Sequence, residues 1–497
     1  MFLTASSWLD SGYGAALREF LVENFRVIAV VESAAESFFA DASINTCITV
    51  LERETDPRAR EGNPVRFVRF NRTLSEILAN RDAPNARQDD KLLRLARMIE
   101  RSDGDNDSYR VRVIGQSELA GVMPDEPGLE ACAEQGWGKY LRAGEVFFRL
   151  IERGRSRLQS LSKLARVRFG VKTGANEFFY VSDALEIPEK GKGNCGGAGK
   201  PKRRKGLLAL GAVASVRRGI TTGANEFFYI KHRPATAKRP PLPIESRFLS
   251  PVIFSLKEIP GILLNRAQAR KVLFNCSLTQ AELEGTGALS YIQSGERAGY
   301  HLRPTCSSRE LWYSVARERK PAPLIFPSKV GERWLVALNR ARVFEDKKLY
   351  GVFPVRGVSA VVLAALLNST WARYYAEVTC RQMTGAQAIA DIDVAVAERI
   401  LLPDPRELSE VIKKKLERAL GQLARRPVYS IFEEVKRSDR RQLDALTLEA
   451  IGFSDRSERE ALLDQLYDAV TELVRARLRK VDRERTIKWK KPTLSPF

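Results

Sequence analysis

The 497-residue chain is 44% hydrophobic, a length and composition typical of roughly three domains with packed cores. Its 82 Lys and Arg residues against 61 Asp and Glu residues give a net charge of +21, which favours a polyanionic partner such as nucleic acid over an inert basic surface. Six widely spaced cysteines, only two histidines, and the lack of a long apolar run or a signal peptide exclude a disulfide framework, a zinc site and a membrane span, and predict a cytoplasmic protein.

The first 135 residues have the pattern of an α/β domain. A strand that ends near residue 4 is followed by a helix, a strand and a second strand, an order typical of the last part of an α/β sheet. Gly12 and Gly14 imitate the start of a nucleotide-binding unit, but a third glycine is missing, so we interpret them as a loop. The periodicity predicts a helix over 14–25, strands over 26–32, 45–53 and 65–70, and an exposed helix over 92–100.

The stretch from residue 136 to 405 mixes strands and helices, and it contains a repeat. The segments VRFGVKTGANEFFYV at 167–181 and VRRGITTGANEFFYI at 216–230 agree at 11 of 15 positions with an offset of 49 residues. Each copy has a basic β-branched run, a Thr-Gly-Ala-Asn corner and an aromatic triplet, an order that predicts a strand, a tight turn and a second strand. Agreement of this extent indicates a duplication.

Several basic segments around the repeat are open to two interpretations. The hexad KPKRRK at 200–205 is either a phosphate-binding finger or part of a solvated linker. Residues 289–313 interleave arginine with aromatic residues, which fits phosphate contact with base stacking, or else aromatic side chains that cover a sheet. Short strands expected over 323–355 offer the cations Lys329, Arg333 and Lys347, and a single helix is expected over 358–378.

From residue 406 onward the pattern is helical. Segments 407–426, 440–452 and 458–481 carry apolar residues at three- and four-residue spacing. The stretch 474–491 has nine Lys and Arg residues against two acidic ones, so it either follows a phosphate backbone or is a solvated helix end. We therefore expect a basic helical module over 406–497.

No group of residues has the spacing of a catalytic site. His232 and His301 lack suitably placed partners, and no glycine loop continues into the Gly-Lys-Ser/Thr of a phosphate-binding loop. The repeated corner instead offers a flexible glycine and adjacent backbone amides that can hold an anion. In this interpretation Asn225 pairs with an adenine edge while Arg217 and Arg218 reach phosphate. The alternative is a plain hairpin turn.

The order of several motifs resembles a known family. WGKYLRAGEVFF, the two repeat copies, SSRELWY, LLNSTWARYYAEVTCRQMTG and ILLPDP occur as in the C-terminal portion of large adenine-specific DNA methyltransferases of restriction-modification and phage-defence systems, in which one polypeptide fuses a methyltransferase to a target-recognition domain. The resemblance covers roughly residues 1–405. It implies an α/β + α fold made of the tail end of a Rossmann-like methyltransferase sheet with an insertion (1–135), a mixed α+β target-recognition domain (136–405) and the helical C-terminal module (406–497).

The resemblance also implies which activities need sequence from elsewhere. Enzymes of this family hold S-adenosylmethionine at a glycine loop and grip a flipped adenine with an Asn/Asp-Pro-Pro-aromatic motif. This chain has neither, since Pro240 and Pro241 lie between Arg239 and Leu242. We therefore expect the chain alone to bind no cofactor and transfer no methyl group. After Arg381 the family's second glycine is also replaced, because Gly385 is followed by Ala386.

Double-stranded DNA is the partner that the resemblance implies, together with a separate methyltransferase polypeptide or a restriction subunit. The alternative is a non-enzymatic DNA-binding specificity subunit or a truncated gene fragment. The residues expected to contact DNA are Arg217, Arg218, Thr222, Gly223, Asn225, Phe228 and Tyr229, followed by Thr173, Gly174, Asn176, Arg309, Trp312, Tyr313, Asn368 and Arg381.

Overall fold

The computed structural model describes most of the chain outside the repeat. The second copy, apart from the backbone of residues 229–230, lies outside the described residues, and so does the KPKRRK hexad. The described residues are 1–11, 14–36, 38, 45–79, 87–101, 103–119, 136–169, 180–182, 229–230, 244–315, 320–383 and 388–490.

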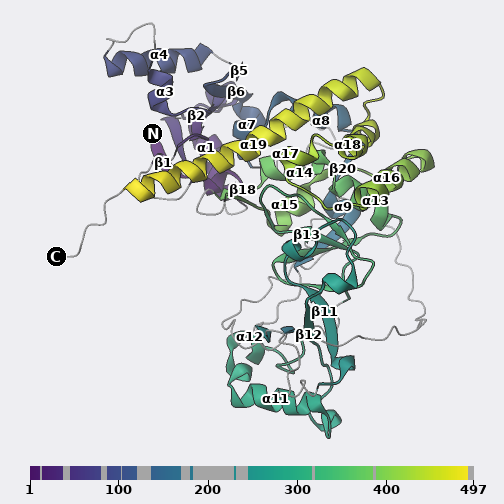
Figure 1. The fold of residues 1–497 in the computed structure, drawn as a ribbon. Coiled ribbons are helices and arrows are strands. Elements are labelled where there is room, and N and C mark those ends of the chain that lie inside the picture. Colours follow the sequence, from purple (N-terminus) through teal and green to yellow (C-terminus); the bar gives the residue numbers. More distant parts are fainter. Residues whose placement is uncertain are drawn as a thin grey trace, which may run out of the picture.

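A six-stranded mixed sheet forms the N-terminal part of the fold, at the upper left of Figure 1. Strand β3 is antiparallel to both β1 and β2, whereas β2 is parallel to β4 and β4 is antiparallel to β6. Alternation of β-branched and aromatic residues explains these strands, and Val27, Val30 and Phe67 are fully buried. The sheet order is β1 (Phe2–Ala5), β3 (Thr46–Arg53), β2 (Phe25–Ser33), β4 (Pro64–Phe70), β6 (Tyr109–Gly115) and β5 (Gly104–Asp105).

Aromatic residues from beyond position 135 complete the core of this sheet. The Trp137 ring lies 5.6 Å from that of Trp8 and 5.9 Å from that of Phe67, and Tyr140 lies 4.9 Å from Phe67. The predicted strands and helices of this part are confirmed. Its helices are the 3-10 turn Ser6–Leu9, α1 (Ala15–Asn24), α2 (Pro57–Glu61), α3 (Leu74–Leu78), the exposed α4 (Gln88–Arg101), α5 (Gln116–Leu119) and α7 (Gly138–Arg142).

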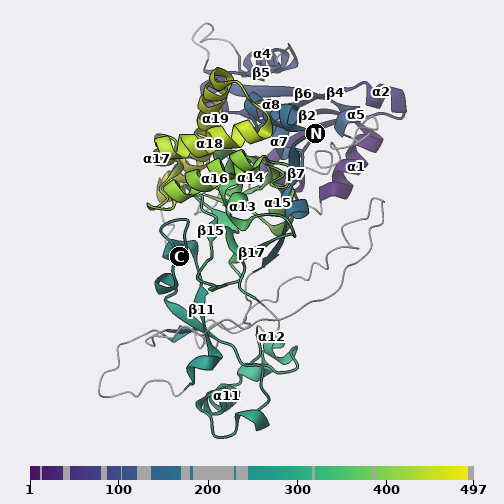
Figure 2. The same ribbon diagram turned by 90° about the vertical axis from the view of Figure 1, so that its right-hand side faces the viewer.

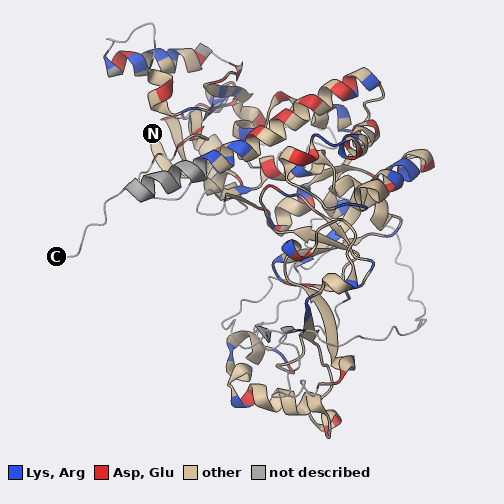
Figure 3. Cartoon of the chain, in the orientation of Figure 1, with Lys and Arg blue, Asp and Glu red and all other residues tan. Residues whose placement is uncertain are grey.

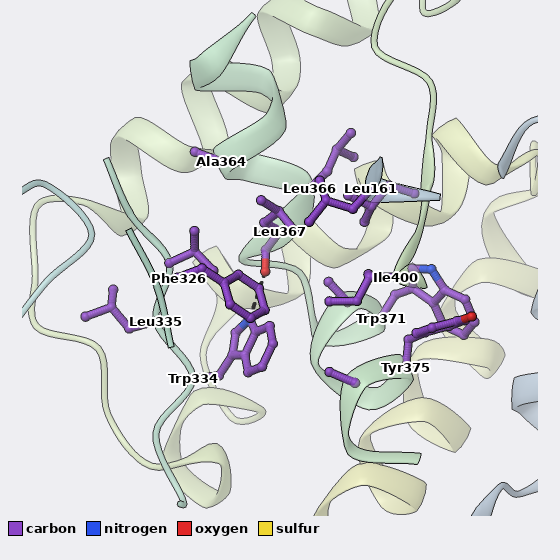
Figure 4. Close-up of a cluster of buried hydrophobic side chains, with 14 of the residues drawn as sticks. Leu161, Phe326, Trp334, Leu335, Ala364, Leu366, Leu367, Trp371, Tyr375 and Ile400 are labelled. Carbon is purple, nitrogen blue, oxygen red and sulfur yellow. Dashed lines mark hydrogen bonds between the residues drawn. The ribbon is translucent and has the colours of Figure 1, made fainter. Parts of the chain in front are cut away.

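The largest core lies between a four-stranded sheet and several helices. Phe326 and Trp334 from the sheet side pack edge to face, and the Trp334 indole donates to the Leu367 carbonyl at 2.8 Å, while Trp371 and Tyr375 of the following helix belong to the same core (Figure 4). The sheet order is β15 (Ala337–Leu338), β13 (Leu324–Pro327), β17 (Leu349–Pro354) and β8 (Ala165–Phe169). The packed elements are α8 (Glu145–Gly154), β7 (Leu158–Ser160), α9 (Leu161–Leu164), α13 (Ala360–Leu367), α14 (Thr370–Thr379), α15 (Val394–Arg399) and β20 (Leu401–Pro403).

The single helix expected over 358–378 is wrong, because the chain breaks between α13 and α14. Asn368 is fully buried, and its side-chain amide bonds to both the N–H and the carbonyl of Val336, at 3.1 and 2.8 Å. The Ser369 hydroxyl accepts from the Ala372 N–H and caps α14. Polar side chains that bond the backbone locally compete with helical hydrogen bonds, so two hydrophobic helices result where apolar periodicity predicts one.

A smaller lobe, at the bottom of Figures 1 and 2, holds a five-stranded sheet. Its core contains Phe248, Phe274, Ile292 and Tyr313. The sheet order is β10 (Tyr229–Ile230), β9 (Tyr180–Ser182), β12 (Lys271–Phe274), β11 (Leu249–Ile253) and β16 (Phe344–Glu345), with helices α11 (Gly287–Arg297) and α12 (Pro304–Ser307) beside it.

The first repeat copy does not form a hairpin. Its first strand, β8, pairs with β17 in the sheet of the large core, and its second strand, β9, pairs with β12 in the sheet of the smaller lobe. Residues 170–179 between them lie outside the described residues. Both predicted strands are therefore present, but they belong to different sheets.

The helices predicted from residue 406 onward are present. Leu462, Leu466, Val470 and Val474 of the last helix are buried, as their spacing predicts. In Figure 3 acidic residues gather toward the start of this helix and basic ones follow. The helices are α16 (Glu410–Leu423), α17 (Ile431–Glu434), α18 (Ser438–Ile451) and α19 (Arg456–Lys490). Among the described residues, no helix combines the length and apolarity that crossing a membrane requires.

Asp444 of α18 ties this module to α14. Its buried carboxylate accepts from the Thr370 N–H at 2.7 Å, the Thr370 hydroxyl at 2.6 Å and the Tyr467 hydroxyl at 2.9 Å. Asp444→Ala leaves three buried donors unpaired, so we expect a loss of about 3 kcal/mol of unfolding free energy in urea titrations. Asp464→Ala, which removes a largely exposed ion pair with Arg441, is the control and should cost at most about 1 kcal/mol. Equal losses for the two variants would contradict this role.

Candidate nucleic-acid interface

Two lysines share one aromatic ring in the smaller lobe. Lys271 opens β12, Lys348 lies in the turn before β17, and their amines lie 4.4 and 3.7 Å from the centre of the Phe254 ring. The turn is held by Asp346, whose carboxylate accepts from the Lys348 N–H at 2.9 Å. Both ammonium groups gain from the electron-rich face of the ring, but they also repel each other across it.

Burial and neighbouring charges shift the pKa of both lysines. Burial lowers the pKa of Lys271 to about 8, opposed by the nearby carboxylates of Glu258 and Asp346 and reinforced by the charge of Lys348. Burial likewise lowers the pKa of Lys348. A phosphate group placed beside the two amines would stabilise their charged forms.

A second pair of cations lies on the three-stranded sheet formed by β14 (Lys329–Val330), β19 (Ile389–Asp391) and β18 (Arg381–Met383). Lys329 and Arg381 are both opposite Asp391 in the register, so the three side chains share one face. Both cations are exposed, and the Lys329 amine lies 4.0 Å from the Asp391 carboxylate. Two cations here flank a single carboxylate.

Hydrogen bonds connect the elements that carry the two pairs, and we call the four cations Lys271, Lys348, Lys329 and Arg381 the basic strip. The Ser328 hydroxyl, next to Lys329 in sequence, donates to the Lys348 carbonyl at 2.5 Å. At the other end the Asn45 side chain, just before β3, donates to the Gln382 carbonyl at 2.9 Å. The backbone that carries the basic strip is therefore connected by hydrogen bonds from the turn before β17 to the residue before β14, and from β18 to the residue before β3.

A buried ionic junction fixes the upper end of the basic strip. The Arg142 guanidinium donates to the Asp10 carboxylate at 2.8 Å, lies 3.6 Å from the Glu32 carboxylate, and donates to the Cys380 carbonyl at 3.2 Å. All four groups are buried. Burial raises the pKa of Asp10 to about 6, against the opposing effect of Arg142. Arg142 thus joins the N-terminal sheet to the residue immediately before β18.

A second ion pair, formed by Arg477 of α19, lies beside β18. Arg477 donates to both oxygens of the Glu377 carboxylate and, at 3.1 Å, to the side-chain oxygen of Gln382. Glu377 is fully buried and also pairs with Arg373 at 3.4 Å. Side chains from three separate parts of the chain therefore bond β18 or the residue before it, namely Asn45, Arg142 and Arg477.

The predicted DNA-contacting residues fall into four groups, of which Arg309, Trp312, Tyr313 and Asn368 form the last. Arg381 is exposed on the basic strip. Tyr229 lies in the edge strand β10, where only its backbone is described. The residues that lie outside the described part are Arg217, Arg218, Thr222, Gly223, Asn225, Phe228, Thr173, Gly174 and Asn176.

The aromatic cluster near residue 312 belongs to the core of the smaller lobe. The Trp312 indole donates to Glu296 at 3.0 Å, the Tyr313 hydroxyl donates to the Leu278 carbonyl at 2.8 Å, and both rings are buried. Arg309 donates to the Trp312 carbonyl at 3.1 Å. Of the two interpretations, the structure therefore agrees with aromatic side chains that cover a sheet. The buried rings are not placed to stack on a base.

Two other side chains expected to be available to DNA instead bond the protein backbone. Asn368 has no exposed surface with which to reach DNA, because it closes the break between α13 and α14. Arg333, expected to be an available cation, turns inward and donates to the carbonyls of Leu256 and Ile259. Both corrections have one cause, since local sequence does not distinguish a polar group that bonds the backbone from one that faces solvent.

Sequence reasoning missed Lys271, Lys348 and Phe254. No local signal marks them, because Phe254 follows β11, Lys271 begins β12, and Lys348 lies more than seventy residues further along the chain. Only the pairing of β12 and β16 with β11 brings them together. Among the described residues, no group of three His, Cys, Asp or Glu side chains is placed to hold a metal ion.

Comparisons with known proteins relate part of the chain to one family. Residues 200–433 match the family model described as the type II methyltransferase M.Eco57I, C-terminal domain. No curated protein matches the sequence.

Two solved structures align with almost the whole chain at low identity. The type IIG restriction endonuclease BpuSI aligns with a TM-score of 0.43 and 14% identity, over 97% of this chain and 47% of its own. The type IIL restriction-modification enzyme MmeI in complex with DNA aligns with a TM-score of 0.39 and 11% identity, over 98% of this chain and 49% of its own. The chain spans about half the length of each enzyme.

Removal of Arg142 tests the junction. Arg142→Met leaves the buried carboxylates of Asp10 and Glu32 without their cation, so we expect the unfolding free energy to fall by about 4 kcal/mol in denaturant titrations. The control is Arg26→Met, which breaks the exposed pair with Glu52 and should cost at most about 1 kcal/mol. A loss at Arg142 as small as that at Arg26 would show that the junction does not hold the two parts together.

Proposed function

We propose that the chain is the DNA target-recognition part of a site-specific adenine DNA methyltransferase of a restriction-modification system, on the premise that residues 200–433 match the model of the type II methyltransferase M.Eco57I, C-terminal domain. The observation that carries the proposal is the basic strip, which crosses the matched region and reaches the N-terminal sheet. Four cations on connected elements can pair with the phosphates of a DNA backbone.

In this proposal the N-terminal sheet is the end of a Rossmann-like methyltransferase domain. Its support is the order β1–β3–β2, in which β1 and β2 run parallel with an antiparallel β3 between them. The 497 residues hold neither the glycine loop for S-adenosylmethionine nor the Asn/Asp-Pro-Pro-aromatic motif. Methyl transfer and cofactor binding therefore require sequence beyond these residues, on the same polypeptide or on a partner.

The proposal assigns phosphate contacts and base contacts to different residues. The basic strip binds phosphate and positions the duplex, which gives affinity without sequence preference. In the Thr-Gly-Ala-Asn corner of the second copy, Asn225 reads an adenine edge, while the neighbouring Arg217 and Arg218 reach phosphate. These residues lie outside the described part, so their role rests on the sequence and on the family.

A free-standing DNA-binding specificity subunit is the second candidate. It is favoured by the coexistence of the basic strip with a sequence that lacks both methyltransferase motifs. The two candidates share DNA recognition and differ in whether a methyltransferase polypeptide acts with the chain. Addition of S-adenosylmethionine and the neighbouring gene product separates them, because only the first predicts labelled adenine in bound DNA.

Selection from a random duplex library tests recognition itself. We expect bound duplexes to share a short motif that contains adenine, and the absence of any enriched motif would refute target recognition. The variant Lys329→Ala/Arg381→Ala should weaken binding to enriched and random duplexes equally and reduce the slope of log affinity against log salt by about 2, since each phosphate contact contributes about 0.9. Lys414→Ala, an exposed cation on α16, is the control and should leave the slope unchanged.

The lowered pKa of Lys271 predicts a pH dependence. Phosphate favours the charged amine, so DNA binding takes up a proton as the pH rises through about 8, the pKa of the free protein. We expect affinity to fall about tenfold between pH 7 and pH 9. Lys271→Arg stays charged throughout and should reduce the decline, as followed by fluorescence anisotropy. If the arginine variant declines as steeply as the wild type, another group is responsible.

A further inference from the structure

The first repeat copy and the residues just before it are packed into the large core by their side chains and by strand pairing. In the stretch from β7 to β8, the side chains of Leu158, Leu161, Leu164, Ala165 and Val167 are buried in the large core. The backbone of the same stretch pairs with β20 on one side and β17 on the other. We call this position the repeat slot, and it demands apolar side chains at five places and a strand backbone at its two ends.

The second copy meets the same demands by sequence. With the offset of 49 residues, the five buried positions correspond to Leu207, Leu210, Val213, Ala214 and Val216, of which four are identical and one exchanges leucine for valine. The partly or fully exposed positions 159, 160, 162, 163, 166 and 168 correspond to 208, 209, 211, 212, 215 and 217, and only the last is identical. The repeat therefore extends back to residue 158, and its buried positions are the ones that agree.

Strand pairing in the smaller lobe gives an independent observation. Strand β10 of the second copy pairs in parallel with β9 of the first, and the register sets Tyr229 opposite Tyr180 and Ile230 opposite Val181. These are equivalent residues of the two copies. Strand β9 pairs in turn with β12, with Tyr180 opposite Leu273, while β10 occupies the edge of the sheet. Equivalent residues of both copies thus lie side by side at one place in the fold.

The family comparison adds a third observation. The match begins at residue 200 and includes the second copy but not the first. The copy that is continuous with the family domain is consequently not the one that fills the repeat slot.

We propose that the repeat slot accepts either copy, so that this chain carries two interchangeable versions of the element that links its two sheets. The versions share the buried side chains and differ on the solvent side, where Lys163 and Arg166 of the first copy correspond to Ala212 and Ser215 of the second. Exchange of the copies would therefore keep the framework and change the surface that it displays. The proposal is independent of the DNA-recognition function.

Two deletions of 49 residues each test the exchange. Deletion of 158–206 removes the first copy and joins the second directly to residue 157, whereas deletion of 183–231 removes the second copy and retains the first. We expect both variants to unfold cooperatively with the thermal midpoint of the full chain. If deletion of 183–231 gives a folded protein and deletion of 158–206 does not, only the first copy fits the repeat slot and the proposal is overturned.

Point variants in the full chain provide a second readout. Val167→Asp places a charge in the core, but the second copy can replace the damaged one, so the thermal midpoint should fall only slightly. Val216→Asp alone should have no effect, because the first copy remains in the repeat slot. The double variant has no intact copy and should lose the cooperative transition. A Val167→Asp variant as unstable as the double variant would contradict exchange.

Discussion

The arrangement of the molecule depends on the guanidinium group of Arg142, which is buried and is therefore not hydrated by bulk water. Arg142 is shared between the carboxylates of Asp10 and Glu32 on the N-terminal side and the carbonyl of Cys380 at the end of α14. A buried ion pair adds little net stability over a well-packed apolar contact, because both ions lose their hydration. Its value is geometric: the carboxylates and the carbonyl must meet one planar group, so the N-terminal sheet has one orientation relative to β18.

The same principle extends to the centre of the fold. Glu377 of α14 is paired with Arg373 on its own helix and with Arg477 on α19, and Asp444 of α18 holds the first turn of α14. Helix α14 is therefore bonded to α18 and α19 through fully buried charges rather than through apolar packing alone. Because each partner is satisfied only in one arrangement, this network specifies the position of the strand that carries Arg381.

Sequence reasoning succeeded where a residue's role follows from its periodicity. The strands of the N-terminal sheet and the apolar face of α19 could be predicted because alternation and three- to four-residue spacing report burial directly. It failed where the role depends on a distant partner. The break at Asn368 depends on the Val336 backbone, and Trp312 is buried because Glu296 and the β-sheet of the smaller lobe enclose it. A local pattern of aromatic and basic residues is the same in a core and at a binding surface.

The repeat is easier to interpret once it is known which of its side chains are buried. From sequence alone, the two copies are most alike at the Thr-Gly-Ala-Asn corner, which directs attention to recognition and to a hairpin. The structure separates the two strands of the first copy into different sheets, so the corner becomes the connection between the large core and the smaller lobe. Similarity at the buried positions upstream then has a physical meaning, since those residues anchor the connection in the large core. The first copy is anchored in the large core by β8, and its strand β9 pairs with β12 of the smaller lobe. The position of β8 therefore influences the position of β12, the strand that Lys271 begins.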